Sequence, residues 1–130
     1  MAKKLRRPEM WKVEPDEHDF QAASDYLSLL LSRAVSQSIV TELEGAEIVY
    51  RKAKDLMRAS RLPLLAADDP HVAADLKKVA KGVLLSPVLL VRGDAEAGVP
   101  LIVADGYHRV CASYHLDENA DIPCRLVDLP

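Results

Sequence analysis

The spacing of hydrophobic residues along the chain separates helical from extended segments. Between residues 20 and 31, apolar side chains recur every three or four positions, which is the period of one helix face. Asp19 precedes this run and is expected to be the N-cap of the helix. The same spacing, over shorter runs, predicts helices over residues 35–43 and 54–60. The first half of the chain is therefore expected to be mainly helical.

The second half combines further helices with extended runs. Asp69 before Pro70 combines a capping carboxylate with the residue preferred at the first helical position, so a helix is expected from Pro70 to Gly82. Another helix should begin at Gly106 and end near Leu116. The extended runs predict strands over residues 47–51, 87–91, 100–104 and 122–127. The two middle strands are joined by a short loop and should pair antiparallel.

Length and composition fit a single α+β domain. The chain has 130 residues, of which 49% are hydrophobic and 28% are charged, which is an ordinary globular balance. We expect a flexible polar tail over residues 1–17 and one domain over residues 18–130. Within that domain, residues 18–60 form a helical part and residues 61–130 form the core.

Net charge and hydropathy indicate which classes of binding partner are not expected. The formal net charge is −3, whereas a nucleic-acid binder usually carries a basic excess, so nucleic-acid binding is not expected. The basic cluster of Lys3, Lys4, Arg6 and Arg7 is read as a solvated terminus. The longest apolar stretch is far shorter than the roughly 20 residues of a membrane-spanning helix, and no signal peptide is recognised. We therefore expect a cytoplasmic protein with no membrane contact and with reduced, buried cysteines.

The most informative segment is Asp105-Gly106-Tyr107-His108-Arg109, at the junction of a strand and a helix. The first backbone N–H groups of a helix have no internal partner, and the helix dipole makes this end positive. Gly106 lacks a Cβ, so a ligand can approach the backbone closely. His108 and Arg109 add positive charge where the dipole already is positive, which a bound phosphate would compensate. Alternatively, Asp105 caps the helix and neutralises both cations internally.

The segment from Asp105 to Ala112 resembles the Gly-x-x-Arg phosphate motif of the ParB/sulfiredoxin superfamily. Gly106, His108 and Arg109 match the Gly-Cys-His-Arg motif of sulfiredoxins, and Ala112 matches an alanine that follows the Gly-Glu-Arg-Arg box of ParB proteins. The order of the surrounding elements over residues 68–128 is also similar, including the closing Ile122-Pro123-Cys124. The resemblance implies a small mixed sheet packed by helices, here with a helical N-terminal extension.

The resemblance also implies a function, namely nucleotide binding with ATP or CTP as ligand and Mg²⁺ as a companion ion. It makes Gly106, His108 and Arg109 phosphate ligands, and His71, at the start of another helix, a further donor. Tyr107 either anchors the core or stacks on the base and closes over the phosphate. Tyr107 stands where sulfiredoxins have their cysteine, so sulfinic acid reduction is not expected. No helix-turn-helix segment follows, which argues against a partition protein.

Two classes of function remain open beside each other. In the first, the nucleotide is hydrolysed or its phosphoryl group transferred, with Asp105 and His108 as the candidate catalytic residues. In the second, the domain is a regulatory or interaction module that binds a nucleotide without chemistry, and its N-terminal helices form a homodimer or contact a protein partner. DNA binding or nuclease activity ranks third. Cys111 and His115 share one helix face, but no matching second ligand pair exists, so no metal site is expected.

Overall fold

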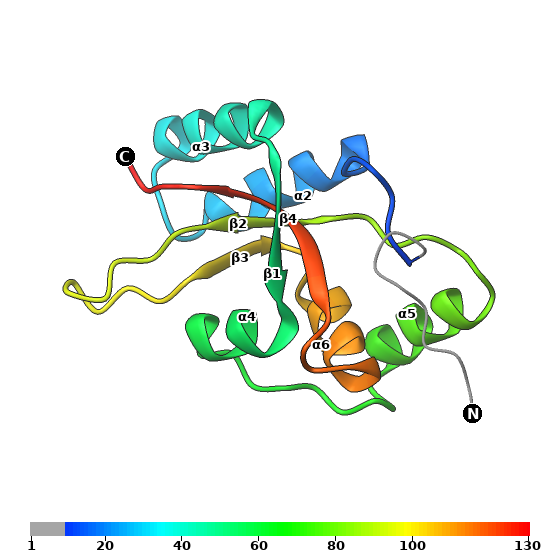
Figure 1. Ribbon diagram of the computed structural model, residues 1–130. Helices are drawn as coiled ribbons and strands as arrows, with labels where there is room; N and C mark the ends of the chain where they lie inside the picture. The colour runs from blue at the N-terminus through cyan, green and yellow to red at the C-terminus, as the bar shows by residue number, and fades with distance from the viewer. Residues whose placement is uncertain (1–9) are drawn as a thin grey trace.

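The computed structural model describes residues 10–130, and within this range it is an α+β fold with a four-stranded mixed sheet (Figure 1). The basic cluster at residues 3–7 lies outside the described residues. In chain order the elements are α2 (Glu17–Leu27), α3 (Arg33–Gly45), β1 (Ile48–Lys52), α4 (Ala53–Ser60), α5 (Pro70–Ala80), β2 (Val88–Val91), β3 (Ile102–Asp105), α6 (Tyr107–Leu116) and β4 (Asp121–Val127).

The strand order in the sheet is β1-β4-β2-β3. The pairs β1–β4 and β2–β3 are antiparallel, and β2 and β4 are parallel. The antiparallel pairing of the two strands beside the 93–98 loop is thus confirmed. Helices α2 and α3 cover one face of the sheet, and α4, α5 and α6 lie on the other (Figure 1).

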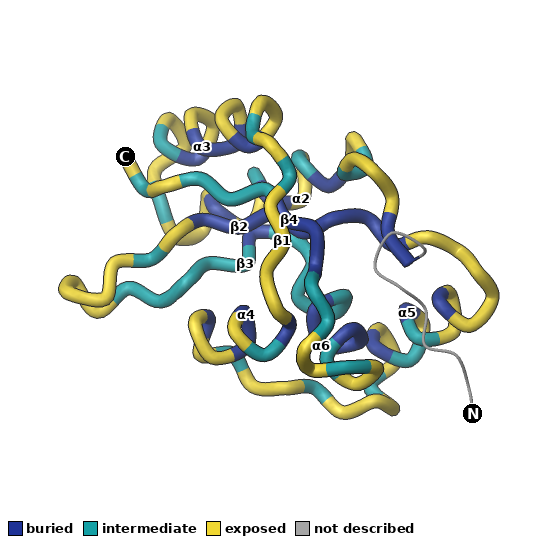
Figure 2. The backbone as a smooth tube through the Cα atoms, viewed as in Figure 1, coloured by how far each residue is buried: buried dark blue, intermediate teal, exposed yellow. Residues whose placement is uncertain are grey.

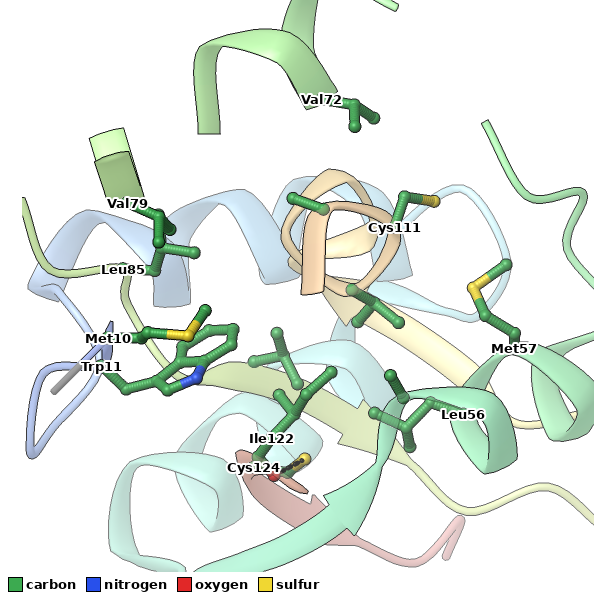
Figure 3. Packing of buried hydrophobic residues seen from close by; sticks show 14 of the residues in the cluster. Met10, Trp11, Leu56, Met57, Val72, Val79, Leu85, Cys111, Ile122 and Cys124 are labelled. Atoms are coloured by element: carbon green, nitrogen blue, oxygen red, sulfur yellow. Dashed lines mark hydrogen bonds between the residues drawn. The ribbon is translucent and has the colours of Figure 1, made fainter. Parts of the chain in front are cut away.

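The burial of strand β2 explains why helices cover both faces of the sheet. Its four residues, Val88 to Val91, are all completely buried (Figure 2). Successive side chains of a strand point to opposite faces. Val88 and Leu90 therefore join the cluster under α4, α5 and α6, which Figure 3 shows, whereas Leu89 and Val91 join the cluster under α2 and α3. Such a strand needs helices on both sides and reads as a continuous apolar run.

Local signals place the start of α5 correctly but not that of α2. The Asp69 carboxylate accepts hydrogen bonds from the backbone N–H groups of His71 (3.0 Å) and Val72 (3.1 Å), as an N-cap should. Asp19, in contrast, is wrong as the N-cap of its helix. The helix begins at Glu17 with Asp16 as N-cap, so Asp19 lies in the first turn, where it is buried.

The described part of the expected tail contributes to the core. Met10 and Trp11 are 6% and 4% exposed and pack beside Leu85 (Figure 3). Trp11 also forms an isolated β-bridge with Leu85, next to a hydrogen bond from the Lys12 N–H to the Leu85 carbonyl (2.8 Å). This segment positions Lys12 and Asp16 beside the start of α2.

Two further expectations concern burial. Both cysteines, Cys111 and Cys124, are free thiols in the core, as predicted. Over residues 10–130, none of the helices combines the length and the apolar character needed to cross a lipid bilayer.

The packing of α2 makes a direct prediction about stability. Leu27 is completely buried in the cluster between α2, α3 and the sheet, whereas Leu29 is 82% exposed just after the helix. Leu27→Ala should lower the free energy of unfolding by about 2–5 kcal/mol, because it removes buried methyl groups and leaves a cavity. The matched variant Leu29→Ala should stay within about 0.5 kcal/mol of wild type. Denaturant titration measures both, and equal losses would contradict the packing of α2.

Candidate functional site

A hollow of about 630 Å³ lies between the start of α2, helix α5, residues 83–86 and the turn from β3 to α6. It brings residues from both helical layers to one place. Ten of its lining residues carry ionisable side chains: Lys12, Asp16, His18, Asp19, His71, Asp75, Lys78, Asp105, His108 and Arg109. Four of the five residues predicted to hold phosphate are among its lining residues, namely Gly106, His108, Arg109 and His71.

The turn from β3 to α6 strongly favours glycine. Gly106 is the N-cap of α6, with φ of 111°, a left-handed conformation that disfavours other residues. A Cβ at this position would lie 2.4 Å from Cγ1 of Val88 and 2.8 Å from Nη2 of Arg109. Within residues 10–130 no side chain caps α6, so Asp105 is not the cap that the alternative interpretation expects. The first backbone N–H groups of α6 are thus left for a ligand or solvent.

Two histidines meet at the wall formed by α5 and α6. The ring centroids of His71 and His108 lie 4.6 Å apart, with an angle of 40° between the rings. Each residue lies in the first turn of its helix, and neither first turn contains an acidic residue. The resemblance groups His71 with the motif, and the structure does bring the two imidazoles together, in a hollow that Lys78 also lines.

Tyr107 does not line the hollow and instead contacts residues 62–65. Its hydroxyl donates a hydrogen bond to the carbonyl of Pro63, and its ring packs against the core cluster under α4, α5 and α6. Burial raises the pKa of Tyr107. In this arrangement Tyr107 anchors the start of α6, which is the first of the two roles considered for it.

Arg109 is held in an ion network rather than pointing freely into the hollow. Its Nη2 lies 2.7 Å from Oδ2 of Asp105 and 3.8 Å from Oδ2 of Asp19, and the side chain is 16% exposed. Burial raises the pKa of Asp105, and the Arg109 guanidinium opposes this rise. Asp105 therefore neutralises much of the Arg109 charge, as the alternative interpretation proposed for this residue, whereas His108 stays outside this pair.

The carboxylates at the start of α2 were missed as site residues. Asp16, His18 and Asp19 place their ligand atoms within 4.8 Å of one another. The Ser86 hydroxyl donates a hydrogen bond to Oδ2 of Asp19, and the Lys12 ammonium, 2.7 Å from Asp16, holds the pKa of that carboxyl below its usual range. The only sequence signal was the run of two aspartates around a histidine, and taking Asp19 as a helix cap concealed it.

Comparison of the chain with protein-family models, with curated proteins and with solved structures finds no match.

The contacts of Gly106 allow an experiment that separates the cost of a steric clash from the cost of backbone strain. Gly106→Ala should destabilise the fold by about 2–5 kcal/mol, because the new methyl group adds a clash with Val88 to the left-handed backbone strain. Gly98→Ala is the control: Gly98 has φ of 73°, and no atom lies within 4 Å of the point where a Cβ would stand, so only the backbone cost of about 1–2 kcal/mol is expected. Thermal unfolding measures both variants, and equal losses would show that the contact with Val88 is absent.

Asp75 predicts a pH-dependent difference in stability. It is 8% exposed on α5, and burial raises its pKa although Lys78 and Arg109 oppose the rise. The folded state therefore holds the Asp75 proton more tightly than the unfolded state does. As the pH rises above the pKa of the unfolded-state carboxyl, ionisation of Asp75 should lower the free energy of unfolding. Asp75→Asn should therefore gain stability relative to wild type between about pH 3 and pH 7. Asp68→Asn, at an exposed aspartate, is the control and should show a smaller gain, and an equal gain in both variants would refute the argument.

Proposed function

We propose that the hollow binds the phosphate groups of a nucleotide at the wall formed by the first turns of α5 and α6. The observation that carries this proposal is the close pairing of His71 and His108, 4.6 Å apart, beside the uncapped start of α6. Imidazole N–H groups and helix N-termini both favour negative charge. A phosphate at this wall accepts hydrogen bonds from several donors at once. Its negative charge also compensates the positive ends of the α5 and α6 helix dipoles.

Arg109 takes a supporting part in this proposal. Its Nη2 is engaged by Asp105, so it contributes positive charge behind the turn while His108, His71 and the α6 backbone make the direct contacts. Lys78 lines the same hollow from α5 and is largely exposed, and in this proposal it contacts a further phosphate. The ligand class follows from the resemblance as ATP or CTP, with Mg²⁺ bound to the phosphates.

Kinship with the ParB/sulfiredoxin superfamily is part of the same proposal. What supports it is the order of elements: a helix after Asp69, a strand after Pro87, an antiparallel partner, the Gly106 turn and a closing strand over Asp121–Val127. In this scheme helices α2 and α3 are an extension that covers the second face of the sheet.

Binding without rapid turnover is the form of this function that the site supports better. Asp105, one of the two candidate catalytic residues, is partly buried and accepts a hydrogen bond from Arg109 at 2.7 Å. A carboxylate engaged in this way is a poor choice for activating water. His108 is the remaining candidate for moving a proton, and phosphate release from ATP or CTP distinguishes an enzyme from a binding module.

The test is calorimetric titration of the full chain with ATP, CTP and inorganic phosphate, each with and without Mg²⁺. Lys78→Ala should lower the affinity for the nucleotide roughly 10-fold or more, because a charge-assisted hydrogen bond contributes about 1.5–3 kcal/mol. Lys77→Ala is the matched control: Lys77 is the neighbouring lysine of the same helix but does not line the hollow, so affinity should not change.

A double variant completes the test. His71→Ala with His108→Ala should abolish binding of all three probes while leaving a folded protein by circular dichroism. At 100 times its dissociation constant, a nucleotide should add about 2.7 kcal/mol to the stability of wild type, and this gain should vanish in the double variant. Undiminished binding in the double variant, or no binding of any probe to wild type at millimolar concentration, would refute the proposal.

A further inference from the structure

Strand β1 forms one edge of the sheet, and its outer side is open. The strand order β1-β4-β2-β3 leaves one neighbour, β4, for β1. Within residues 10–130, the backbone of Ile48–Lys52 hydrogen-bonds to no element other than β4. The strand at the opposite edge, β3, is half-buried because α2 packs along it. The fold therefore covers one edge of its sheet and leaves the other exposed.

The hydrogen bonds beside β1 show which of its backbone groups point outward. Just after the strand, the Ala53 N–H donates a hydrogen bond to the Ala120 carbonyl (2.9 Å), which continues the β1–β4 register. Hydrogen-bonded residues alternate along an antiparallel pair, so the odd-numbered residues of β1 are the ones that bond to β4. The N–H and C=O groups of Ile48 and Tyr50 therefore point away from the sheet.

The side chains of β1 are exposed on both faces of the strand. Val49 is 37% exposed and Tyr50 is 58% exposed (Figure 2), and neighbouring residues of a strand point to opposite faces. An apolar, β-branched and aromatic run with free backbone groups is a template for another strand, and folded proteins that stay monomeric cover or interrupt such an edge. The composition of this edge therefore indicates a strand as its partner.

The charges at the two ends of the strand are complementary to each other. Glu47 directly precedes β1 and Arg51 lies near its end, and both are exposed. Neither residue has an ion pair within the described range. If a second β1 lies antiparallel with the two copies of Val49 opposite each other, Glu47 of each copy faces Arg51 of the other. The adjacent registers place Val49 opposite one of these charges instead, so the charge pattern specifies one register.

We propose that β1 pairs antiparallel with β1 of a second copy of this chain, about a two-fold axis at Val49. In this arrangement Ile48 and Tyr50 of one copy exchange backbone hydrogen bonds with Tyr50 and Ile48 of the other, and the two sheets become one continuous sheet. The contact is isologous, as in most symmetric dimers, and strand addition of this kind obtains its affinity from the backbone. A single strand pair is a small interface, so the dimer dissociates in the micromolar range.

The experiment is analytical ultracentrifugation of the full chain from micromolar concentration to about 0.5 mM, a range suited to a small interface. Wild type should form a dimer. Glu47→Arg and Arg51→Glu each place like charges opposite each other, so each should weaken dimerisation roughly 10-fold or more. An equimolar mixture of these two variants restores opposite charges at both pairs and should dimerise as wild type does. Glu96→Arg is the matched control, because it makes the same charge change in the exposed 93–98 loop and should leave the dimer unchanged.

A backbone variant tests the hydrogen bonds separately from the charges. Tyr50→Pro removes an N–H group that points outward, which an edge strand tolerates because no bond to β4 is lost. It should abolish the dimer while the circular dichroism spectrum stays that of the folded monomer. Tyr50→Thr keeps the N–H group and should still dimerise.

Three results would overturn the inference. The first is a wild-type chain that stays monomeric at about 0.5 mM, where a small interface of this kind is populated. The second is dimerisation of the single charge variants with wild-type affinity, or failure of their mixture to associate. The third is a dimer that survives Tyr50→Pro, which would place the contact elsewhere, for example at the exposed Leu29 and Leu30 after α2. None of these measurements involves the hollow, so this inference and the proposed phosphate site can fail independently.

Discussion

Strand β2 is apolar on both of its faces and must be shielded from water on both. The arrangement of the helices in the rest of the molecule follows from this requirement. Val88 and Leu90 face the layer of α4, α5 and α6, while Leu89 and Val91 face α2 and α3. Each such side chain gains about 1.5–3 kcal/mol from burial, but only when both helical layers are in place. Just before β2, the chain at Ser86 runs between the two layers, and there the layers separate enough to leave the hollow.

The hollow lies between two layers, and each layer contributes ionisable side chains of both kinds. The wall at the start of α2 carries Lys12, Asp16, His18 and Asp19, whereas α5 and α6 carry His71, Asp75, Lys78, His108 and Arg109. Four carboxylates face three permanently charged bases in the lining, so the hollow as a whole is no simple anion site. Arg109 lies between Asp19 and Asp105 and keeps the carboxylates of the two walls from repelling each other.

The parts of this arrangement that follow from neighbouring residues were predictable from the sequence. The start of α5 at Asp69 and Pro70 and the turn at Gly106 are local signals, and both elements lie where the sequence predicts them. The parts that depend on tertiary packing were not predictable from the pattern. Asp19 receives its hydrogen bond from Ser86, 67 residues away. A capping rule based on nearby residues cannot foresee that an aspartate in the first turn will be buried by a partner so distant in sequence.

The same distinction applies to the motif itself. The alternation of charge and glycine over residues 105–109 correctly marks a special turn, because Gly106 is forced by its conformation and by its contact with Val88. The pattern left open whether Arg109 faces a ligand or is neutralised by Asp105, and the pairing depends on geometry: the two side chains come close because the strand ends and the helix starts within one residue. The strand-to-helix turn therefore engages Arg109 internally and leaves the imidazole of His108 lining the hollow.

If a phosphate binds at the histidine wall, its charge acts on both helical layers through Arg109. Negative charge near the Gly106 turn attracts the same guanidinium that is paired with Asp105 and faces Asp19 of α2. Because α2 belongs to one helical layer and α6 to the other, such coupling would act at the hollow, where the layers are separated.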